Sequence, residues 1–206
     1  MILEVEGRTF HHRGSESDTV VIRELWGNED DYKVRGLDPT PKIVVDVGGN
    51  IGLFSALIAH LYPEAKTYVY EPELDNYAYL LKNIEQFGES IIPHRSAIYL
   101  DDSGVNLTPN HGLTEVTGTG DYAPSITLDT ALEPFDQVDI LKCDTEGSEF
   151  EIFGAASIDT MSKIKLLTME FHDYYGANRR EFLISKLAET HDMQWINHAI
   201  YVGWRK

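Results

Sequence analysis

The sequence has a single cysteine, few basic side chains and no long apolar run. Cys143 alone cannot form an intrachain disulfide, which fits a reducing compartment. Lys and Arg number 17 against 34 Asp and Glu, so the net charge is −17. Nucleic acids and anionic membranes require basic surfaces, so we expect neither as a partner. No stretch approaches the ~18 apolar residues of a membrane span, and no basic leader precedes an apolar run, so we expect a cytoplasmic protein.

The most informative stretch is residues 43–52, Ile-Val-Val-Asp-Val-Gly-Gly-Asn-Ile-Gly. The apolar run from Ile43 to Val45 is typical of a strand that is buried on both faces. Apolar residues at helical spacing follow the glycines from Leu53 onward. A strand, a glycine turn and a helix form the ligand-binding corner of an α/β sheet, where glycine lets a ligand approach the backbone.

The residues of this turn limit the class of ligand. A dinucleotide site needs glycine at the first, third and sixth positions, and the registers from Gly48 and Gly49 both fail. No Lys-Ser or Lys-Thr pair follows to form a phosphate-binding loop. The remaining pattern, Asp46-x-Gly48-Gly49-x-x-Gly52, has a carboxylate that repels a pyrophosphate and suits an ammonium or sulfonium group. The alternative is a tight turn that binds no ligand.

Strands and helices alternate along the rest of the chain, which predicts one domain built on a doubly wound, mostly parallel sheet. Residues 101–125 are rich in Gly, Thr, Asn and Asp, and we expect a hairpin or loop insertion there. The predicted strands are 1–10, 43–45, 67–71, 91–99, 138–143, 165–171, 195–197 and 200–204, and the predicted helices are 18–26, 53–61, 73–87, 148–154 and 179–190.

Acidic residues follow two of the predicted strands, at the edge of the sheet where ligands bind. Glu71 ends the strand after the glycine turn, the position at which such folds hold a ribose diol; the alternative is a solvated charge. Asp144 and Glu146 follow the strand 138–143 and are predicted site residues. Glu149 falls in the first turn of the next helix, where we expect a capping role.

A histidine ends the next strand of the predicted sheet. His172 lies close enough to the same edge to take a proton near neutral pH, although a lone histidine is more often structural. Because side chains alternate along a strand, Glu170 and His172 should point to one face and Phe171 to the other.

Together these stretches resemble the FkbM family of S-adenosylmethionine-dependent methyltransferases. The resemblance covers roughly residues 43 to 173, and the string Lys-x-Asp-x-Glu-Gly-x-Glu at 142–149 is its most specific part. The matching segments are Val-Asp-Val-Gly-Gly-Asn-Ile-Gly at 45–52, Tyr-Glu-Pro at 70–72, Ile-Thr-Leu-Asp at 126–129, Leu-Lys-Cys-Asp-Thr-Glu-Gly-Ser-Glu at 141–149 and Met-Glu-Phe-His at 169–172.

The resemblance implies a seven-stranded, Rossmann-like methyltransferase sheet whose last strand is antiparallel. It implies a methyltransferase domain at 43–206, with 1–42 as an N-terminal extension of the same domain on the substrate side. It implies S-adenosylmethionine as cofactor and a small hydroxylated molecule, such as a sugar or secondary metabolite, as substrate. The cofactor-binding residues it implies are Asp46, Gly48, Gly49, Asn50 and Gly52 around the methionine part, Glu71 and Pro72 at the ribose, and Ser96 and Ala97 near the adenine.

The mechanism we expect is in-line transfer of a methyl group to a substrate hydroxyl. We nominate His172 as the base, with Asp144 and Glu146 placing the acceptor or assisting deprotonation. Carboxylates also suit Mg²⁺, but adjacent acids alone do not justify assigning a metal. The alternatives are a non-catalytic binding module on the same fold and a nicotinamide-dependent oxidoreductase, against which the failed glycine register counts.

Overall fold

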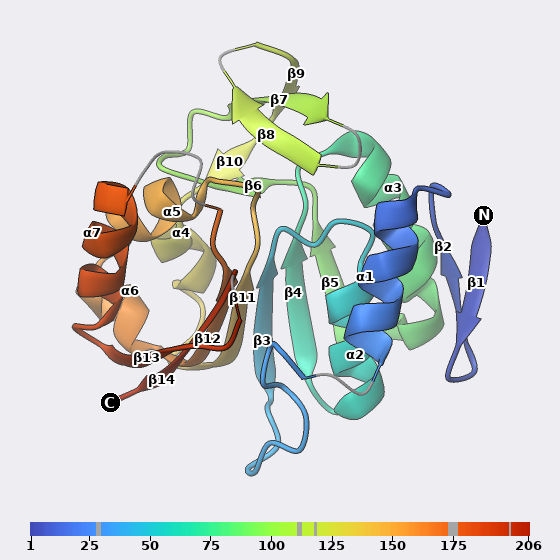
Figure 1. Cartoon of the computed structure of the whole chain (residues 1–206), viewed down its shortest axis with the longest axis horizontal. Helices are drawn as coiled ribbons and strands as arrows, with labels where there is room; N and C mark the ends of the chain where they lie inside the picture. Colours follow the sequence, from blue (N-terminus) through green and yellow to red (C-terminus); the bar gives the residue numbers. More distant parts are fainter. Residues whose placement is uncertain (28–29, 111–112, 118, 173–176, 198) are drawn as a thin grey trace.

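A seven-stranded sheet runs through the centre of the protein, with helices on both of its faces (Figure 1). The computed structural model describes residues 1–27, 30–110, 113–117, 119–172, 177–197 and 199–206. Six strands run in the same direction, and only β14, between β12 and β13, runs antiparallel to them, which confirms the predicted sheet. In spatial order the strands are β13 (His191–Trp195), β14 (Ile200–Arg205), β12 (Ile164–Glu170), β11 (Val138–Cys143), β3 (Ile43–Val47), β4 (Lys66–Tyr70) and β5 (Ile91–His94).

The helices divide between the two faces of this sheet (Figure 1). One face carries α1 (Glu16–Trp26), α2 (Leu53–Leu61) and α3 (Leu74–Ile84), which continues as a 3₁₀ segment, η1 (Glu85–Ser90). The other carries α4 (Leu128–Leu132), α5 (Glu149–Ala155), α6 (Ile158–Ser162) and α7 (Ala177–Leu187). None of the helices among the described residues combines the length and apolar composition that a bilayer crossing requires.

The central strands are apolar on both faces because both are covered. Val44 and Ile140 belong to the core cluster under α1 and α2, and Val45 and Leu141 belong to the cluster on the opposite face. All four side chains are fully buried. This alternation with period two explains why the strands read as continuous apolar runs in the sequence.

The segment before β3 packs on the α1–α3 side. Its first two strands, β1 (Ile2–Val5) and β2 (Arg8–His11), form an antiparallel hairpin. Asn83 of α3 is buried; its Oδ1 accepts the His11 amide at 2.6 Å, and its Nδ2 donates to the Ile51 carbonyl at 2.7 Å. One side chain therefore ties the N-terminal hairpin to both α3 and the glycine turn.

The predicted insertion at 101–125 forms a small antiparallel sheet rather than a single hairpin, in the order β8-β7-β9. Its strands are β7 (Val105–Asn110), β8 (Leu113–Thr117) and β9 (Asp121–Ala123). The predicted strand 91–99 is two strands, because β6 (Ala97–Ile98) leaves β5 to pair with β10 (Ser125–Ile126). The insertion lies over the carboxyl ends of the central strands (Figure 1).

The predicted strand 195–197 is wrong in its bounds. β13 already ends at Trp195, and Oδ1 of Asn197 accepts the amides of Ala199 and Ile200, both at 2.9 Å, which makes the turn into β14. The helices α4 and α6, capped by side chains of the preceding residues, were not predicted. Five residues are too few to show a helical period.

Candidate active site

The glycine turn between β3 and α2 is shaped by close packing against its neighbours. Gly48 has a φ of +80°, a conformation that favours glycine. A Cβ at Gly48 would lie 1.8 Å from the Asp144 carbonyl oxygen, and one at Gly49 would lie 2.2 Å from Cγ2 of Val69. The absent side chains therefore let the turn approach the ends of β4 and β11. Gly48 and Gly49 were also expected to let a ligand approach the backbone, and that role stays a prediction, because both residues line cavities.

Asp46 lies beneath the turn and is fully buried. The Ser55 hydroxyl donates to its Oδ2 at 2.6 Å, and the Lys142 Nζ lies 3.4 Å from its Oδ1. Burial raises the pKa of Asp46, and the charge of Lys142 offsets part of that rise. Asp46 was expected to face a positively charged ligand, but the strand turns its buried side chain toward Ser55 of α2. The predicted role of Asp46 in cofactor binding stays a prediction. It would be indirect, because Asp46 contacts Lys142, which donates to the Gly48 carbonyl of the turn.

Glu71 follows β4 and joins the glycine turn to the start of α3. Its Oε2 accepts the Asn50 amide at 2.8 Å, and its Oε1 accepts the Glu73 amide at 2.9 Å. Burial raises the pKa of Glu71 to about 7, although these two hydrogen bonds lower it. The carboxylate lines a cavity beside the apolar side chains of Ile98 and Leu107. A hydrogen-bond acceptor next to an apolar surface is the chemistry that fits a ribose diol and a purine.

Two cavities lie at this edge of the sheet and share three lining residues, Asn50, Asp144 and Glu146. The smaller, of about 70 Å³, contains Glu71, and side chains of β7 and β8 cover it. The larger, of about 370 Å³, falls within the usual size range of ligand pockets.

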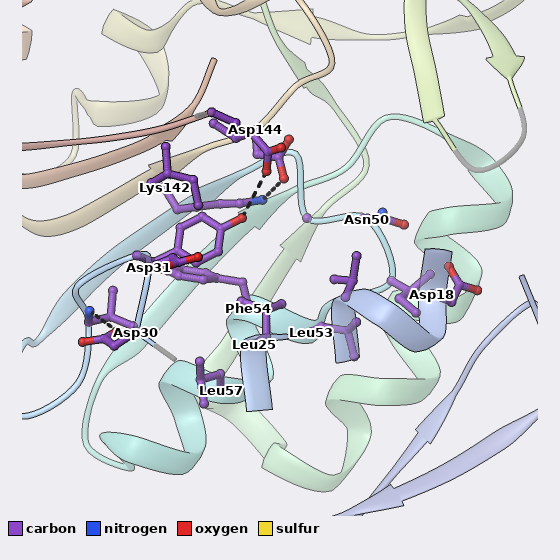
Figure 2. Close-up of a pocket in the computed structure, with 18 of the residues that line it drawn as sticks. Asp18, Leu25, Asp30, Asp31, Asn50, Leu53, Phe54, Leu57, Lys142 and Asp144 are labelled. Carbon is purple, nitrogen blue, oxygen red and sulfur yellow. Dashed lines mark hydrogen bonds and ion pairs between the residues drawn. The ribbon is translucent and has the colours of Figure 1, made fainter. Parts of the chain in front are cut away.

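The larger cavity has an apolar centre and polar ends (Figure 2). In Figure 2, apolar side chains of α1 and α2 lie along the middle, with Asp30 and Asp31 at one end and Asp18 and Asn50 at the other. The labelled apolar residues are Leu25, Leu53, Phe54 and Leu57.

The structure brings most of the predicted site residues to these cavities. Those that line the smaller cavity are Gly48, Asn50, Glu71, Pro72, Ala97, Asp144 and Glu146. Those that line the larger cavity are Gly49, Asn50, Asp144 and Glu146. Within the described chain, the predicted residues outside both linings are Asp46, Gly52, Ser96 and His172.

The loop after β11 is organised by Glu149, whose side chain is 1% exposed. Its Oε1 accepts the amide and the hydroxyl of Thr145, both at 3.0 Å, and lies 3.2 Å from Nδ1 of His172. On the other side of the imidazole, Nε2 lies 3.3 Å from Oε2 of Glu146. Glu149 was expected only to cap a helix; instead it holds the loop and orients His172.

The same contacts give Glu146 and His172 different pKa values. Burial raises the pKa of Glu146 to about 7, and the charge of His172 holds it from rising further. Burial lowers the pKa of His172, but the hydrogen bond and charge of Glu149 raise it to about 9. A protonated imidazole cannot accept a proton, so near pH 7 these values count against His172 as the base.

The described residues include one group that could hold a metal ion. Ligand atoms of Asp144, Glu146 and His172 all lie within 4.8 Å of one another. An ion there would have to displace the proton of His172 and compete with Lys142, whose Nζ lies 3.4 Å from Oδ2 of Asp144.

Three further residues of the site were not predicted. Lys142 donates from Nζ to the Gly48 carbonyl at 2.7 Å. Tyr32 lines the larger cavity and donates to Oε2 of Glu170 at 3.4 Å, and Arg13 lines the end near the glycine turn. A lysine within a buried strand is a signal that could have identified Lys142. Nothing in the local sequence marks Tyr32 or Arg13, because both reach the site from the N-terminal segment.

Solved structures with similar folds are methyltransferases and related proteins at low sequence identity. A fibrillarin/Nop5p complex aligns with a TM-score of 0.56 and 10% identity, covering 100% of this chain and 93% of that one. A methyltransferase from Agrobacterium tumefaciens described as SAM-dependent gives 0.54 and 11%, covering 100% and 69%. The precorrin-6y C5,15-methyltransferase of Geobacter metallireducens gives 0.51 and 9%, covering 97% and 94%. These similarities show the fold.

The family is identified from the sequence. No curated protein matches the chain in sequence. The model of the Methyltransferase FkbM domain matches residues 46–193, which include the glycine turn, Glu71, the loop after β11 and His172. The chain therefore belongs to the FkbM family of methyltransferases, and its cofactor is S-adenosylmethionine.

Proposed function

We propose that this methyltransferase transfers the methyl group of S-adenosylmethionine to a hydroxyl oxygen of a small molecule, and that Glu146 accepts the hydroxyl proton. One observation carries the proposal: Glu146 lines both cavities, and its carboxylate has a pKa of about 7. A base works best when its pKa lies near the operating pH.

The two cavities suggest how the cofactor is held. In this proposal the adenosine part occupies the smaller cavity, where Glu71 accepts the ribose hydroxyls and Pro72 and Ala97 provide apolar contacts. Asn50 and Asp144 line both cavities and would hold the methionine part where it extends into the larger one. When bound, the cofactor supplies an electrophilic methyl group on a positively charged sulfur. The carboxylates at the junction favour that positive charge.

The surroundings of Glu146 support its role as base. Its backbone has a φ of +54°, a conformation that few residues other than glycine adopt and that is concentrated at functional sites. Glu149 and His172 hold the loop and the carboxylate from one side. As the acceptor oxygen forms its bond to the methyl carbon and the carbon–sulfur bond breaks, the hydroxyl proton moves to Glu146. His172 remains protonated and steadies the carboxylate.

The larger cavity indicates the kind of acceptor. Its centre is formed by apolar side chains, so we infer that the acceptor has an apolar body in addition to its hydroxyl group. That favours a secondary metabolite over an unmodified sugar. Residues 1–42 contribute Val21, Leu25, Tyr32 and Val34 to the wall, which supports the expectation that this extension belongs to the same domain and lies on the substrate side.

A mass-spectrometric screen of hydroxylated metabolites for the gain of one methyl group tests the reaction, and variants test the base. Glu146→Gln should bind S-adenosylmethionine in calorimetry as the wild type does and lower kcat by about 10²–10⁴. The wild-type kcat should rise with pH through about 7 as Glu146 ionises. His172→Gln should retain activity but shift this rise to higher pH, because the cation that favours ionised Glu146 is lost.

The opposite pattern would refute this assignment. If His172→Gln abolishes turnover at every pH while Glu146→Gln remains active, the base is His172. If the wild type binds neither S-adenosylmethionine nor its demethylated product, the chain is a binding module without this chemistry.

A further inference from the structure

The larger cavity is lined by more carboxylates than cations. Three described lining residues are cationic, namely Arg13, Arg35 and Lys142. Six are acidic, namely Asp18, Asp30, Asp31, Asp144, Glu146 and Glu170. This excess suits the sulfonium and ammonium groups of the cofactor but repels its carboxylate. The carboxylate therefore needs a cation at the end of the cavity that its amino-acid part reaches.

Two of the three cations are committed elsewhere. Lys142 donates to the Gly48 carbonyl and lies beside Asp46 beneath the turn. Arg35 donates from Nη2 to the carbonyls of Leu25 and Gly27, both at 3.0 Å. The backbone of Arg35 is bonded to Asp30, at the end of the cavity opposite Asn50 (Figure 2).

Arg13 is the cation beside Asn50, at the end of the cavity where Asp18 lies. Its Nη2 donates to Oδ1 of Asn50 at 3.1 Å, and its Nη1 donates to Oδ1 of Asn76. Asp18 accepts from Nε at 3.2 Å and from Nη2 at 2.5 Å, which fixes the plane of the guanidinium group. Arginine has five N–H donors, so these partners leave one Nη1 hydrogen unassigned within the described chain. The side chain lines the cavity and is 21% exposed.

We propose that Arg13 binds the carboxylate of the amino-acid part of S-adenosylmethionine. The inference rests on the proposed placement of the cofactor across the two cavities. It makes the N-terminal segment part of the cofactor site, because Arg13 precedes α1 and reaches the turn through Asn50. Asp18 and Asn76 act as positioning residues that hold the guanidinium group in place before the cofactor binds.

Calorimetry with two ligands tests this directly in the full chain. Decarboxylated S-adenosylmethionine keeps the sulfonium and amino groups and lacks only the carboxylate. The wild type should bind S-adenosylmethionine about tenfold or more tighter than this analogue, as expected for a charge-assisted hydrogen bond. In Arg13→Gln the ratio should fall to about one or below, because the acidic cavity then favours the more positive analogue. Arg23→Gln, which removes an exposed arginine of α1, should keep the wild-type ratio.

Each other outcome is decisive. If the wild type binds both ligands equally, the proposal is overturned without any variant. If Arg13→Gln weakens both ligands by the same factor, Arg13 is structural and the proposal is also overturned. Arg13→Lys keeps the charge but loses the planar guanidinium group, so its ratio of affinities for the two ligands should be intermediate. This variant replaces Arg13→Gln as the test if the glutamine variant does not fold. If the wild type binds neither ligand, the proposed function itself fails.

Discussion

The buried carboxylate of Glu71 should make the protein less stable as the pH rises toward neutrality. Its pKa is raised from 4.5 to about 7 by burial, so between these values the folded state keeps a proton that the unfolded state has released. Stability from this group is therefore complete below about pH 4.5 and lost as the pH rises through about 7. Glu71→Gln cannot ionise, so it should lack this loss.

The size of the effect follows from the pKa difference. From about pH 5.5 to about pH 8 the folded group titrates almost fully, and the unfolded group is already ionised, which gives about 2 kcal/mol. Urea unfolding at both pH values should show wild-type stability falling by about 2 kcal/mol more than that of Glu71→Gln. Titrations common to both proteins cancel in this difference when they are independent of Glu71.

The control is Glu85→Gln, because Glu85 is an exposed glutamate just after α3. It should follow the wild type at both pH values. An identical pH dependence in wild type and Glu71→Gln would refute the claim that Glu71 is buried with a raised pKa. In the proposed cofactor site the same variant should also bind S-adenosylmethionine about tenfold more weakly, because it loses one acceptor for the ribose hydroxyls.

Two further substitutions test the framework beneath the turn. Lys142→Met should lower the free energy of unfolding by about 3–5 kcal/mol, because it leaves the buried carboxylate of Asp46 without its cation. Adding Asp46→Asn should recover most of that loss, and equal stability of the single and double variants would contradict the pairing. Gly48→Ala should lower it by about 3 kcal/mol or more in urea unfolding, since φ is +80° and the new Cβ would overlap the Asp144 carbonyl. Gly154→Ala, with nothing within 4 Å of its Cβ, should be tolerated, and equal stability of these two alanine variants would refute the packing argument.

Much of the fold could be predicted because the residue types of a buried strand depend on which of its faces are covered. The run from Ile43 to Val45 is apolar on both faces since helices cover both faces, and the same reasoning identified β11 and β12. Very short elements have too few residues to show such a pattern. β6 and β10 have two residues each and depend on pairing with each other, so their formation is a property of the folded chain.

The sequence by itself located the candidate site, because the glycine turn, Glu71 and the string from Asp144 to Glu149 are contiguous motifs that follow strands of one sheet. Only the tertiary structure decided what each charge does. Asp46 is neutralised by Lys142 beneath the turn, Glu146 faces the cavities beside His172, and Arg13 arrives from the N-terminal segment. The physical reason is that the charge state and accessibility of a side chain depend on burial and on neighbours from other elements, which local spacing does not record.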